Sequence, residues 1–331
     1  MNNNRICIIL PYFGTFNEYF NLFLESCKFN KTIDWYILTD DKNSYNYPGN
    51  VYVTYCAFSD IQKKAYKLLG DDIQIDTPYD LCKFRVIYHK LFPEIVDTYI
   101  YWGFCDCDLI WGDISTLILP ALKENYGKIH WRGHFTLFKN IDTIRDLYSL
   151  KIPGNTTFED CISKEKKNQY NLFDEVGINK IFDYCHIPIY KKLLIADLKI
   201  GVKNFYCNHF SEKEAYKNNK QIFEWNKGKL FRWYVHEDKL FREEFAYIHF
   251  LKRNMRNYLT NNFSEHYLII PPDKIIDYVP ISIDYINKVT KEGVYWRYYM
   301  QRFTPKVVFR KVKDALLSNK MLPDEYPYII S

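Results

Sequence analysis

Two aspartates one residue apart, Asp106 and Asp108, are the side chains in this 331-residue sequence that are best placed to do chemistry. They follow the apolar run at residues 99–104, and further apolar residues and Gly112-Asp113 come after them. Carboxylates in so apolar a setting are unfavourable unless they are paired or bind a metal. An Asp-x-Asp pair suits a hard divalent cation that also holds a diphosphate. The alternative is a pair of capping or solvated aspartates.

The elements that must position this pair alternate between strand-like and helix-like segments. Apolar runs predict buried strands at residues 5–11, 33–39, 51–55 and 99–104. Apolar residues at helical spacing predict helices at residues 16–27, 59–69 (capped by Ser59) and 79–91. This alternation predicts an α/β fold with a doubly wound, mostly parallel sheet and helices on both faces. In such a sheet, ligands bind at the carboxyl ends of the strands.

After residue 113 the pattern is mixed. Hairpin-like or short apolar runs are found at residues 129–138, 223–233, 245–250 and 267–270. Helical spacing is found at residues 142–150 and 175–184. We expect this half to complete the edge of the same sheet, so that residues 1–290 form one domain.

The composition is that of a globular protein, with 47% hydrophobic and 26% charged residues. It excludes a disordered or fibrous chain, and no stretch approaches the roughly 20 apolar residues that cross a bilayer. The nine cysteines are odd in number and scattered through a long chain. We therefore expect reduced thiols and a cytoplasmic location. The 18% aromatic residues could stack on sugars or bases, or could simply fill the core and its rim.

The positive charge is concentrated near the C-terminus. Residues 291–320 carry a net charge of +6 and the rest of the chain −1, and aromatic residues such as Trp296 and Phe303 lie among these charges. We interpret residues 291–331 as a separate basic, aromatic helical segment. The pattern suits peripheral contact with an anionic membrane, or a helix packed on the domain by its aromatic face. No RNA-binding motif accompanies it, so no nucleic-acid partner is expected.

The segment from Trp102 to Asp113 resembles the Asp-x-Asp metal site of GT-A-fold glycosyltransferases that use nucleotide sugars. It is most similar to bacterial proteins of capsular and surface polysaccharide synthesis, which share the pattern Trp-Gly-x-x-Asp-x-Asp-x-x-x-Gly-Asp. Other short segments match these proteins in the same order, at residues 9–14, 39–41, 81–84, 133–135, 173–175 and 249–253. The resemblance covers roughly residues 5–270 and implies a GT-A-type, Rossmann-like domain.

The resemblance implies a metal site with Mn²⁺ or Mg²⁺ as cofactor. Asp108 would bind the metal directly, Asp106 would contact both metal and ribose, and His249 would be a third ligand. His249 lies in an apolar run, where a lone histidine is often a hydrogen-bonded core residue, and this alternative remains open.

The resemblance also implies a set of residues around a nucleotide-sugar donor. The loop beneath the nucleotide would be formed by Pro11, Tyr12, Phe13 and Gly14, and Asp40 would lie near the base or ribose. Lys83 matches a basic donor-contacting position, although Arg85 is hard to distinguish from it. Lys252 and Arg253 would face the diphosphate, or they belong to a solvated helix face.

The acidic pair Asp174-Glu175 could supply the general base that deprotonates an acceptor hydroxyl. The alternative is a pair of carboxylates that stabilise the start of a helix. An inverting transferase needs such a base, whereas a retaining transferase can use the donor phosphate. His134 is a candidate for contact with the acceptor.

Together these residues predict a metal-dependent transfer of a hexose from a nucleotide sugar, with UDP as the expected nucleotide. The acceptor would be a glycan or lipid-linked glycan of bacterial surface polysaccharide, handled on the inner face of the membrane. Two alternatives belong to other classes: a metal-dependent phosphohydrolase or nucleotidyltransferase, and a non-catalytic glycan-binding relative.

Overall fold

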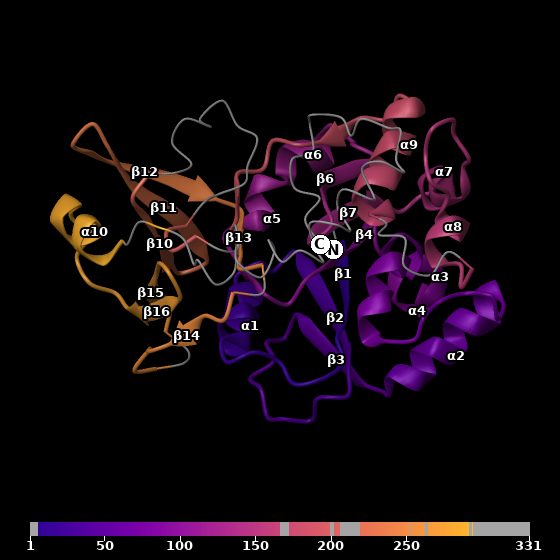
Figure 1. The fold of residues 1–331 in the computed structure, drawn as a ribbon, viewed down its shortest axis with the longest axis horizontal. Coiled ribbons are helices and arrows are strands. Elements are labelled where there is room, and N and C mark those ends of the chain that lie inside the picture. The colour runs from indigo at the N-terminus through magenta and orange to yellow at the C-terminus, as the bar shows by residue number, and fades with distance from the viewer. Residues whose placement is uncertain are drawn as a thin grey trace, which may run out of the picture.

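The structure is a computed structural model and describes residues 6–165, 172–198, 202–205, 219–251, 253–261, 264–290 and residue 293. Over these residues the protein is of mixed α/β class, with its strands in three sheets. The largest sheet occupies the centre of the view in Figure 1, and another sheet lies at the left end.

The central sheet has the strand order β3-β2-β1-β4-β7-β6-β8. Its strands are β1 (Ile6–Pro11), β2 (Ile33–Thr39), β3 (Val51–Tyr55), β4 (Tyr101–Cys105), β6 (Lys128–Arg132), β7 (Phe135–Lys139) and β8 (Ile189–Tyr190). The four strands from β3 to β4 are parallel, whereas β7 is antiparallel to both of its neighbours and β8 is parallel to β6. The carboxyl ends of β1, β2 and β4 therefore lie at one edge of the sheet, where the loops that follow them meet.

Helices cover both faces of this sheet. They are α1 (Phe20–Lys28), α2 (Phe58–Leu69), α3 (Tyr88–Leu91), α4 (Pro93–Val96), α5 (Ile114–Leu117), α6 (Leu119–Lys123), α7 (Asp142–Arg145), α8 (Phe158–Ile162) and α9 (Ile178–Tyr184), with 3-10 helices η1 (Pro78–Ile87) and η2 (Leu147–Ser149) and the π-helix η3 (Phe173–Gly177). Successive side chains of β1 point to opposite faces. Ile6 and Ile8 belong to the core under α1, whereas Cys7 and Ile9 belong to the core that contains α2, η1 and α9.

A small sheet joins three distant parts of the chain in the order β5-β13-β9. Strand β13 (Tyr247–His249) is antiparallel to β5 (Leu109–Trp111) and parallel to β9 (Ile195–Asp197). The segment before β13 passes close to Gly112, the residue after β5. No side chain fits there, because a Cβ atom on Gly112 would lie 2.4 Å from the carbonyl oxygen of Phe245. The Gly112 N–H donates to the carbonyl of Ala246 at 2.8 Å, which holds the two segments together.

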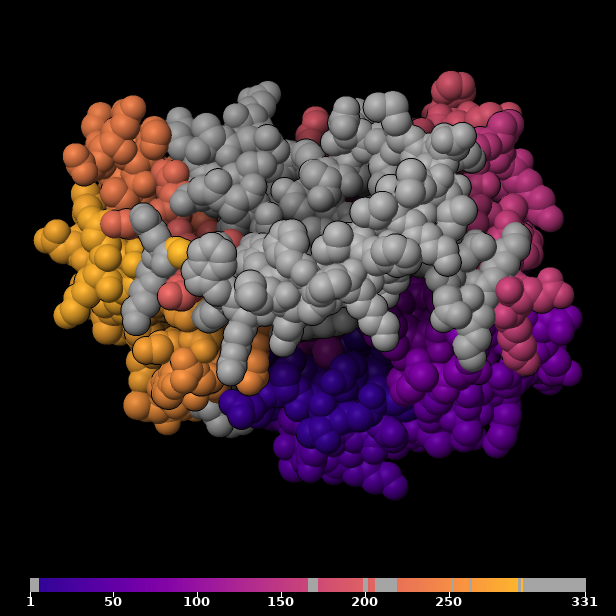
Figure 2. Space-filling view, in the orientation of Figure 1, coloured from indigo at the N-terminus to yellow at the C-terminus, as the bar shows by residue number. Residues whose placement is uncertain are grey.

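A further sheet has the order β12-β11-β10-β15-β16-β14 and lies beside α10 (Ile283–Val289) at the left end of Figure 1. Its strands are β10 (Gln221–Asn226), β11 (Lys229–His236), β12 (Lys239–Phe245), β14 (Arg256–Asn257), β15 (His266–Ile270) and β16 (Lys274–Asp277). The orange and yellow atoms of this region form that end of the surface in Figure 2. The sheet packs onto the rest of the protein through an apolar cluster that includes Leu22, Ile110 and Trp225.

The structure confirms the α/β class, the helices on both faces and most of the predicted strands. The expectation of one mostly parallel sheet is wrong in part, because residues 221–277 build a separate and largely antiparallel sheet. The predicted α-helix at residues 79–91 is mainly the 3-10 helix η1. Helix α2 begins at Phe58 and has Ala57, not Ser59, at its N-cap position.

The described part of the chain contains no helix with the length and apolarity needed to cross a bilayer. The proposed basic segment at residues 291–331 lies outside the described residues, except for Gly293.

Candidate functional site

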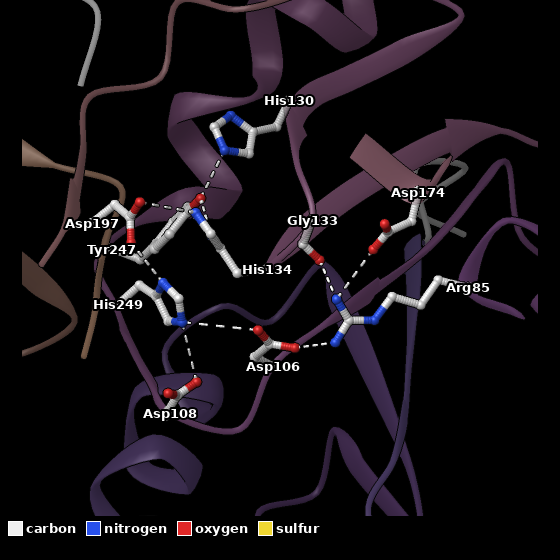
Figure 3. Close-up of polar contacts among 10 residues, drawn as sticks. All are labelled: Arg85, Asp106, Asp108, His130, Gly133, His134, Asp174, Asp197, Tyr247 and His249. Carbon is white, nitrogen blue, oxygen red and sulfur yellow. Dashed lines mark hydrogen bonds and ion pairs between the residues drawn. The ribbon is translucent and has the colours of Figure 1, made fainter. Parts of the chain in front are cut away.

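The two aspartates and the histidine predicted as metal ligands meet at the carboxyl end of β4 (Figure 3). His249 Nε2 lies 3.4 Å from Asp108 Oδ1 and 3.8 Å from Asp106 Oδ2. One ligand atom from each of the three side chains lies within 4.8 Å of the others. The aspartate side chains are 28% and 18% exposed, so a cation from solvent can reach them.

Backbone hydrogen bonds hold these residues together although they are far apart in the sequence. The Asp106 N–H donates to the carbonyl of His134, and the Phe250 N–H donates to the carbonyl of Asp108, both at 3.0 Å. The Leu198 N–H donates to the carbonyl of His249, also at 3.0 Å. The loop after β4 is therefore fixed against the β6–β7 hairpin on one side and against β13 on the other.

Behind His249 lies a buried polar group that extends away from solvent. His249 Nδ1 is 2.8 Å from Asp197 Oδ1, and the His249 ring stacks on His134 with 4.3 Å between ring centroids. Tyr247 Oη lies 3.0 Å from His134 Nδ1 and 2.8 Å from His130 Nε2. Each of these five residues is less than 9% exposed, so their mutual contacts decide how each ring is oriented.

The charges of the histidines differ because their neighbours differ. Burial lowers the pKa of His249, but the carboxylates of Asp108 and Asp197 outweigh it and hold this pKa well above the ordinary value. Burial, together with the neighbouring His249 and His130, lowers the pKa of His134 well below that value. Without a metal, His249 is the cationic member of the stacked pair and His134 the neutral one.

Arg85, on η1, links the metal-ligand group to a second acidic group. Its guanidinium donates to Asp106 Oδ1, to the carbonyl of Gly133 at 2.6 Å and to Asp174 Oδ2 at 3.4 Å. Burial lowers the pKa of Arg85, but Asp106 more than compensates, so the side chain stays cationic. The sequence resemblance assigned contact with the donor to Lys83 and left Arg85 hard to distinguish from it.

The predicted acidic pair Asp174-Glu175 lies on the π-helix η3, beside the β6–β7 hairpin. Gly133 eases this approach, because a Cβ atom there would make tight contacts of 3.1 Å with Asp174 Oδ2 and 3.3 Å with Glu175 Oε2. Burial raises the pKa of Asp174 to about 6, with Arg85 opposing the rise. Glu175 Oε1 pairs with Arg132 Nη1 at 3.0 Å. With a pKa of about 6, Asp174 can exchange a proton near neutral pH.

The loop after β1 and the end of β2 come together at the same edge of the sheet. Gly14 donates its N–H to Asp40 Oδ1 at 2.7 Å, and the Tyr12 N–H donates to the carbonyl of Leu38 at 2.8 Å. Burial, with Cys107 and Asp108 as further contributors, raises the pKa of Tyr12, so its ring lies close to the Asp-x-Asp loop. The loop formed by Pro11, Tyr12, Phe13 and Gly14 thus lies at the same edge of the sheet as Asp106 and Asp108, and its contact with a nucleotide stays a prediction.

Two predicted residues make contacts elsewhere, and a third lies outside the described residues. Lys83 pairs with Asp80 at 2.9 Å and bonds to Gln74. Arg253 donates to the carbonyl oxygens of Pro272 and Val202 at 2.8 and 3.2 Å. Lys252 lies outside the described residues. The assignment of Lys83 to the donor, and of Lys252 and Arg253 to its diphosphate, remains a prediction.

The donor set suits a divalent metal that prefers oxygen but tolerates nitrogen. Asp106 and Asp108 offer carboxylate oxygens, and His249 offers an imidazole nitrogen. Carboxylates suit both Mg²⁺ and Mn²⁺, while an imidazole is more typical of transition metals. Of the two cofactors expected from the sequence, Mn²⁺ fits this set better.

Asp197 is the member of the site that sequence reasoning missed. It lies in the apolar run 193–198, where a single carboxylate must find a partner to be buried. The apolar run therefore indicates a buried carboxylate with a partner, but it does not reveal that the partner is His249.

The comparisons with known proteins identify the family of this chain but not its function. A comparison with curated proteins found no match to the chain. The profile of a family of unknown function, DUF6625, matches residues 8–278, a range that contains every described residue of the site. The chain therefore belongs to the DUF6625 family.

Proposed function

We propose that this protein is a metal-dependent glycosyltransferase that moves a hexose from a nucleotide sugar, with UDP as the nucleotide, to a hydroxyl of a glycan or lipid-linked glycan. We place the reaction in bacterial surface polysaccharide synthesis, on the basis of the sequence resemblance described above. The observation that carries the proposal is the convergence of Asp106, Asp108 and His249 at the carboxyl end of β4.

The surrounding elements favour a nucleotide-sugar donor. The strand order β3-β2-β1-β4 with parallel pairing is that of a Rossmann-like nucleotide-binding half. The β1 loop and Asp40 border the same edge of the sheet as the Asp-x-Asp loop. A GT-A-type domain would place the base and ribose over the β1 loop and Asp40, and the diphosphate over the Asp-x-Asp loop.

Asp106, Asp108 and His249 would hold Mn²⁺ or Mg²⁺, which when bound supplies Lewis-acid stabilisation of the charge on the leaving diphosphate. Arg85 lies beside Asp106 and adds a fixed positive charge at the same place. A cation already in position stabilises developing negative charge without reorganisation. Arg85 would thus orient the donor and assist the departure of the diphosphate.

Asp174 is the candidate general base. Its carboxylate would take the proton from the acceptor hydroxyl while the acceptor oxygen bonds to the anomeric carbon of the donor. The bond from that carbon to the phosphate oxygen breaks, and its electron pair leaves with the diphosphate. A pKa of about 6 suits this role, because the group is ionised at neutral pH yet retains some basicity. Contact of His134 with the acceptor stays a prediction, because His134 and Asp174 are similarly buried, at 8% and 7% exposed.

The deciding experiment is a titration of the full chain with UDP and UDP-sugars, with and without Mn²⁺, followed by product analysis. The proposed enzyme binds UDP in a metal-dependent way and transfers the sugar to a glycan acceptor. A phosphohydrolase or nucleotidyltransferase would instead release or exchange phosphate without an acceptor. A glycan-binding relative without catalysis would bind neither UDP nor metal.

A further inference from the structure

We infer that Asp197 is a positioning residue that selects the nitrogen of His249 offered to the metal. The inference rests on the proposed function, because it concerns the same metal site. It goes beyond that proposal by assigning a role to a residue that is not one of the three proposed metal ligands.

The argument begins with the strand register. Asp197 and His249 are direct partners in the parallel pairing of β9 with β13, and Leu109, next to Asp108, is the partner of His249 on the other side. The small sheet therefore places the carboxylate of Asp197, the imidazole and the Asp-x-Asp loop in one row. In Figure 3 Asp197 lies on the side of the ring opposite Asp106 and Asp108.

The second step concerns the hydrogen bond. His249 Nδ1 lies 2.8 Å from Asp197 Oδ1, and an ionised carboxylate can only accept. When the ring gives up one proton to bind a cation, the proton that remains is therefore held on Nδ1, and Nε2 is the nitrogen that offers its lone pair. Nε2 is also the nitrogen nearest Asp108 and Asp106, at 3.4 and 3.8 Å. A carboxylate behind a metal-binding histidine fixes the ring orientation and makes the histidine a stronger ligand.

The third step concerns the plane of the ring. His134 stacks on His249 at 28° between ring planes, and Tyr247 bonds to His134 and to His130. These contacts hold the plane of the His249 ring parallel to the face of His134 to within 28°. Asp197 then decides which edge of the ring faces the aspartates.

The experiment is a Mn²⁺ titration of the full chain without nucleotide, in which the electron paramagnetic resonance signal of free Mn²⁺ is measured. We expect Asp197→Asn to weaken Mn²⁺ binding by about 10- to 100-fold, the range observed when such outer partners are removed. The amide can donate to Nδ1 as well as accept from it, so both edges of the ring become available. The matched control is Asp34→Asn, because Asp34 is equally buried and accepts a bond from Tyr99 Oη at 2.7 Å, away from the site. We expect the control to leave Mn²⁺ affinity unchanged.

Long-range ¹⁵N–¹H NMR of the wild-type chain provides a test that does not depend on the folding of a variant. With Mg²⁺ saturating the site, His249 should carry its proton on Nδ1, with its signals assigned by comparison with His249→Gln. A proton on Nε2, or equal Mn²⁺ affinity in the wild type and Asp197→Asn, would overturn the inference. So would a second bound metal that Asp197→Asn removes, because Asp197 would then be a ligand.

The outcomes separate this inference from the proposed function. Tight Mn²⁺ binding that depends on Asp197, without any sugar transfer, would support the positioning role and refute the transferase. Sugar transfer by the wild type, with unchanged Mn²⁺ affinity in Asp197→Asn, would support the transferase and refute the positioning role. A wild-type chain that binds no Mn²⁺ would refute both.

Discussion

The guanidinium of Arg85 lies between two carboxylates of the site and donates to Asp106 on one side and to Asp174 on the other. Without it, the proposed metal ligand and the proposed base would face each other as like charges. Arg85 thus couples the protonation of Asp174 to the group that would hold the metal. The same cation also lies where a diphosphate would need a counter-charge.

The first prediction follows from this position. Arg85→Gln should lower the rate of sugar transfer by about 100-fold, as loss of one preorganised donor does in other active sites. Lys83→Gln should have a smaller effect, because Lys83 pairs with Asp80. Steady-state kinetics of both variants with the same donor and acceptor measure the difference. A larger loss for the Lys83 variant would restore Lys83 as the donor-contacting residue.

The second prediction concerns Asp108. Asp108→Asn should abolish metal-dependent UDP binding, because the variant loses a charged ligand atom beside His249 Nε2. The melting temperature of the metal-free variant should stay close to that of the wild type, since the amide has the same shape. Calorimetric UDP titration with and without Mn²⁺, together with thermal unfolding, tests both statements. A strongly destabilised metal-free protein would mean that Asp108 has a structural role.

The third prediction concerns His249 itself. His249→Ala should raise the Mn²⁺ concentration required for half-maximal activity by at least about tenfold, because the site loses one of three ligands. Activity measured across a Mn²⁺ series shows whether saturating metal restores the rate. If stability falls while the metal dependence is unchanged, His249 is a core residue.

The fourth prediction is a pH dependence set by Asp174. Its pKa is raised to about 6 from an ordinary value of 3.8, so the transfer rate should fall as the pH drops below about 6. A raised acid pKa means that the folded state binds the proton more tightly than the unfolded state does. The stability that Asp174 contributes is therefore lost as the pH rises from about 4 to about 6. Asp174→Asn should abolish the acid limb of the rate profile, and its stability relative to wild type should increase over the same interval. A rate profile of the variant that keeps the acid limb would assign the base elsewhere.

The fifth prediction concerns residues 291–331, whose role rests on sequence alone. The full chain should co-sediment with vesicles that contain anionic lipid, and less so at high salt, because such attraction is screened over roughly 8 Å at physiological ionic strength. Replacing Arg310, Lys311 and Lys313 with Gln should reduce binding, since each basic residue adds about 1 kcal/mol of attraction. Neutral vesicles serve as the control. A wild-type chain that ignores anionic vesicles at low salt would favour a helix packed on the domain.

Local patterns predicted the parts of the site that depend on local structure. An apolar run that ends in two aspartates predicts a strand end, and Asp106 and Asp108 lie directly after β4. The resemblance left Lys83 and Arg85 hard to distinguish, because both lie in the same short run at residues 80–85. In a 3-10 helix residues three apart are eclipsed, so Lys83 lies above Asp80 and Arg85 points to another side.

Long-range pairing could not be predicted in the same way. Asp197 and His249 are 52 positions apart, and no local pattern encodes the register of β9 with β13. The second sheet was missed for the same reason. The hairpin at residues 223–233 was recognised, but its pairing with β15 and the addition of β16 and β14 depend on contacts between separate segments.

The small β5-β13-β9 sheet has a consequence for synthesis of the chain. The ribosome releases Asp106 and Asp108 long before His249. Strand β13, which carries His249, then pairs with two strands made earlier, β5 and β9. Domains fold largely as they emerge, and contacts of high sequence separation form late. A nascent chain that stops before residue 247 would therefore bind Mn²⁺ weakly, and full affinity would report that β13 has been inserted between β5 and β9. Metal binding would thus report assembly of the small sheet during synthesis.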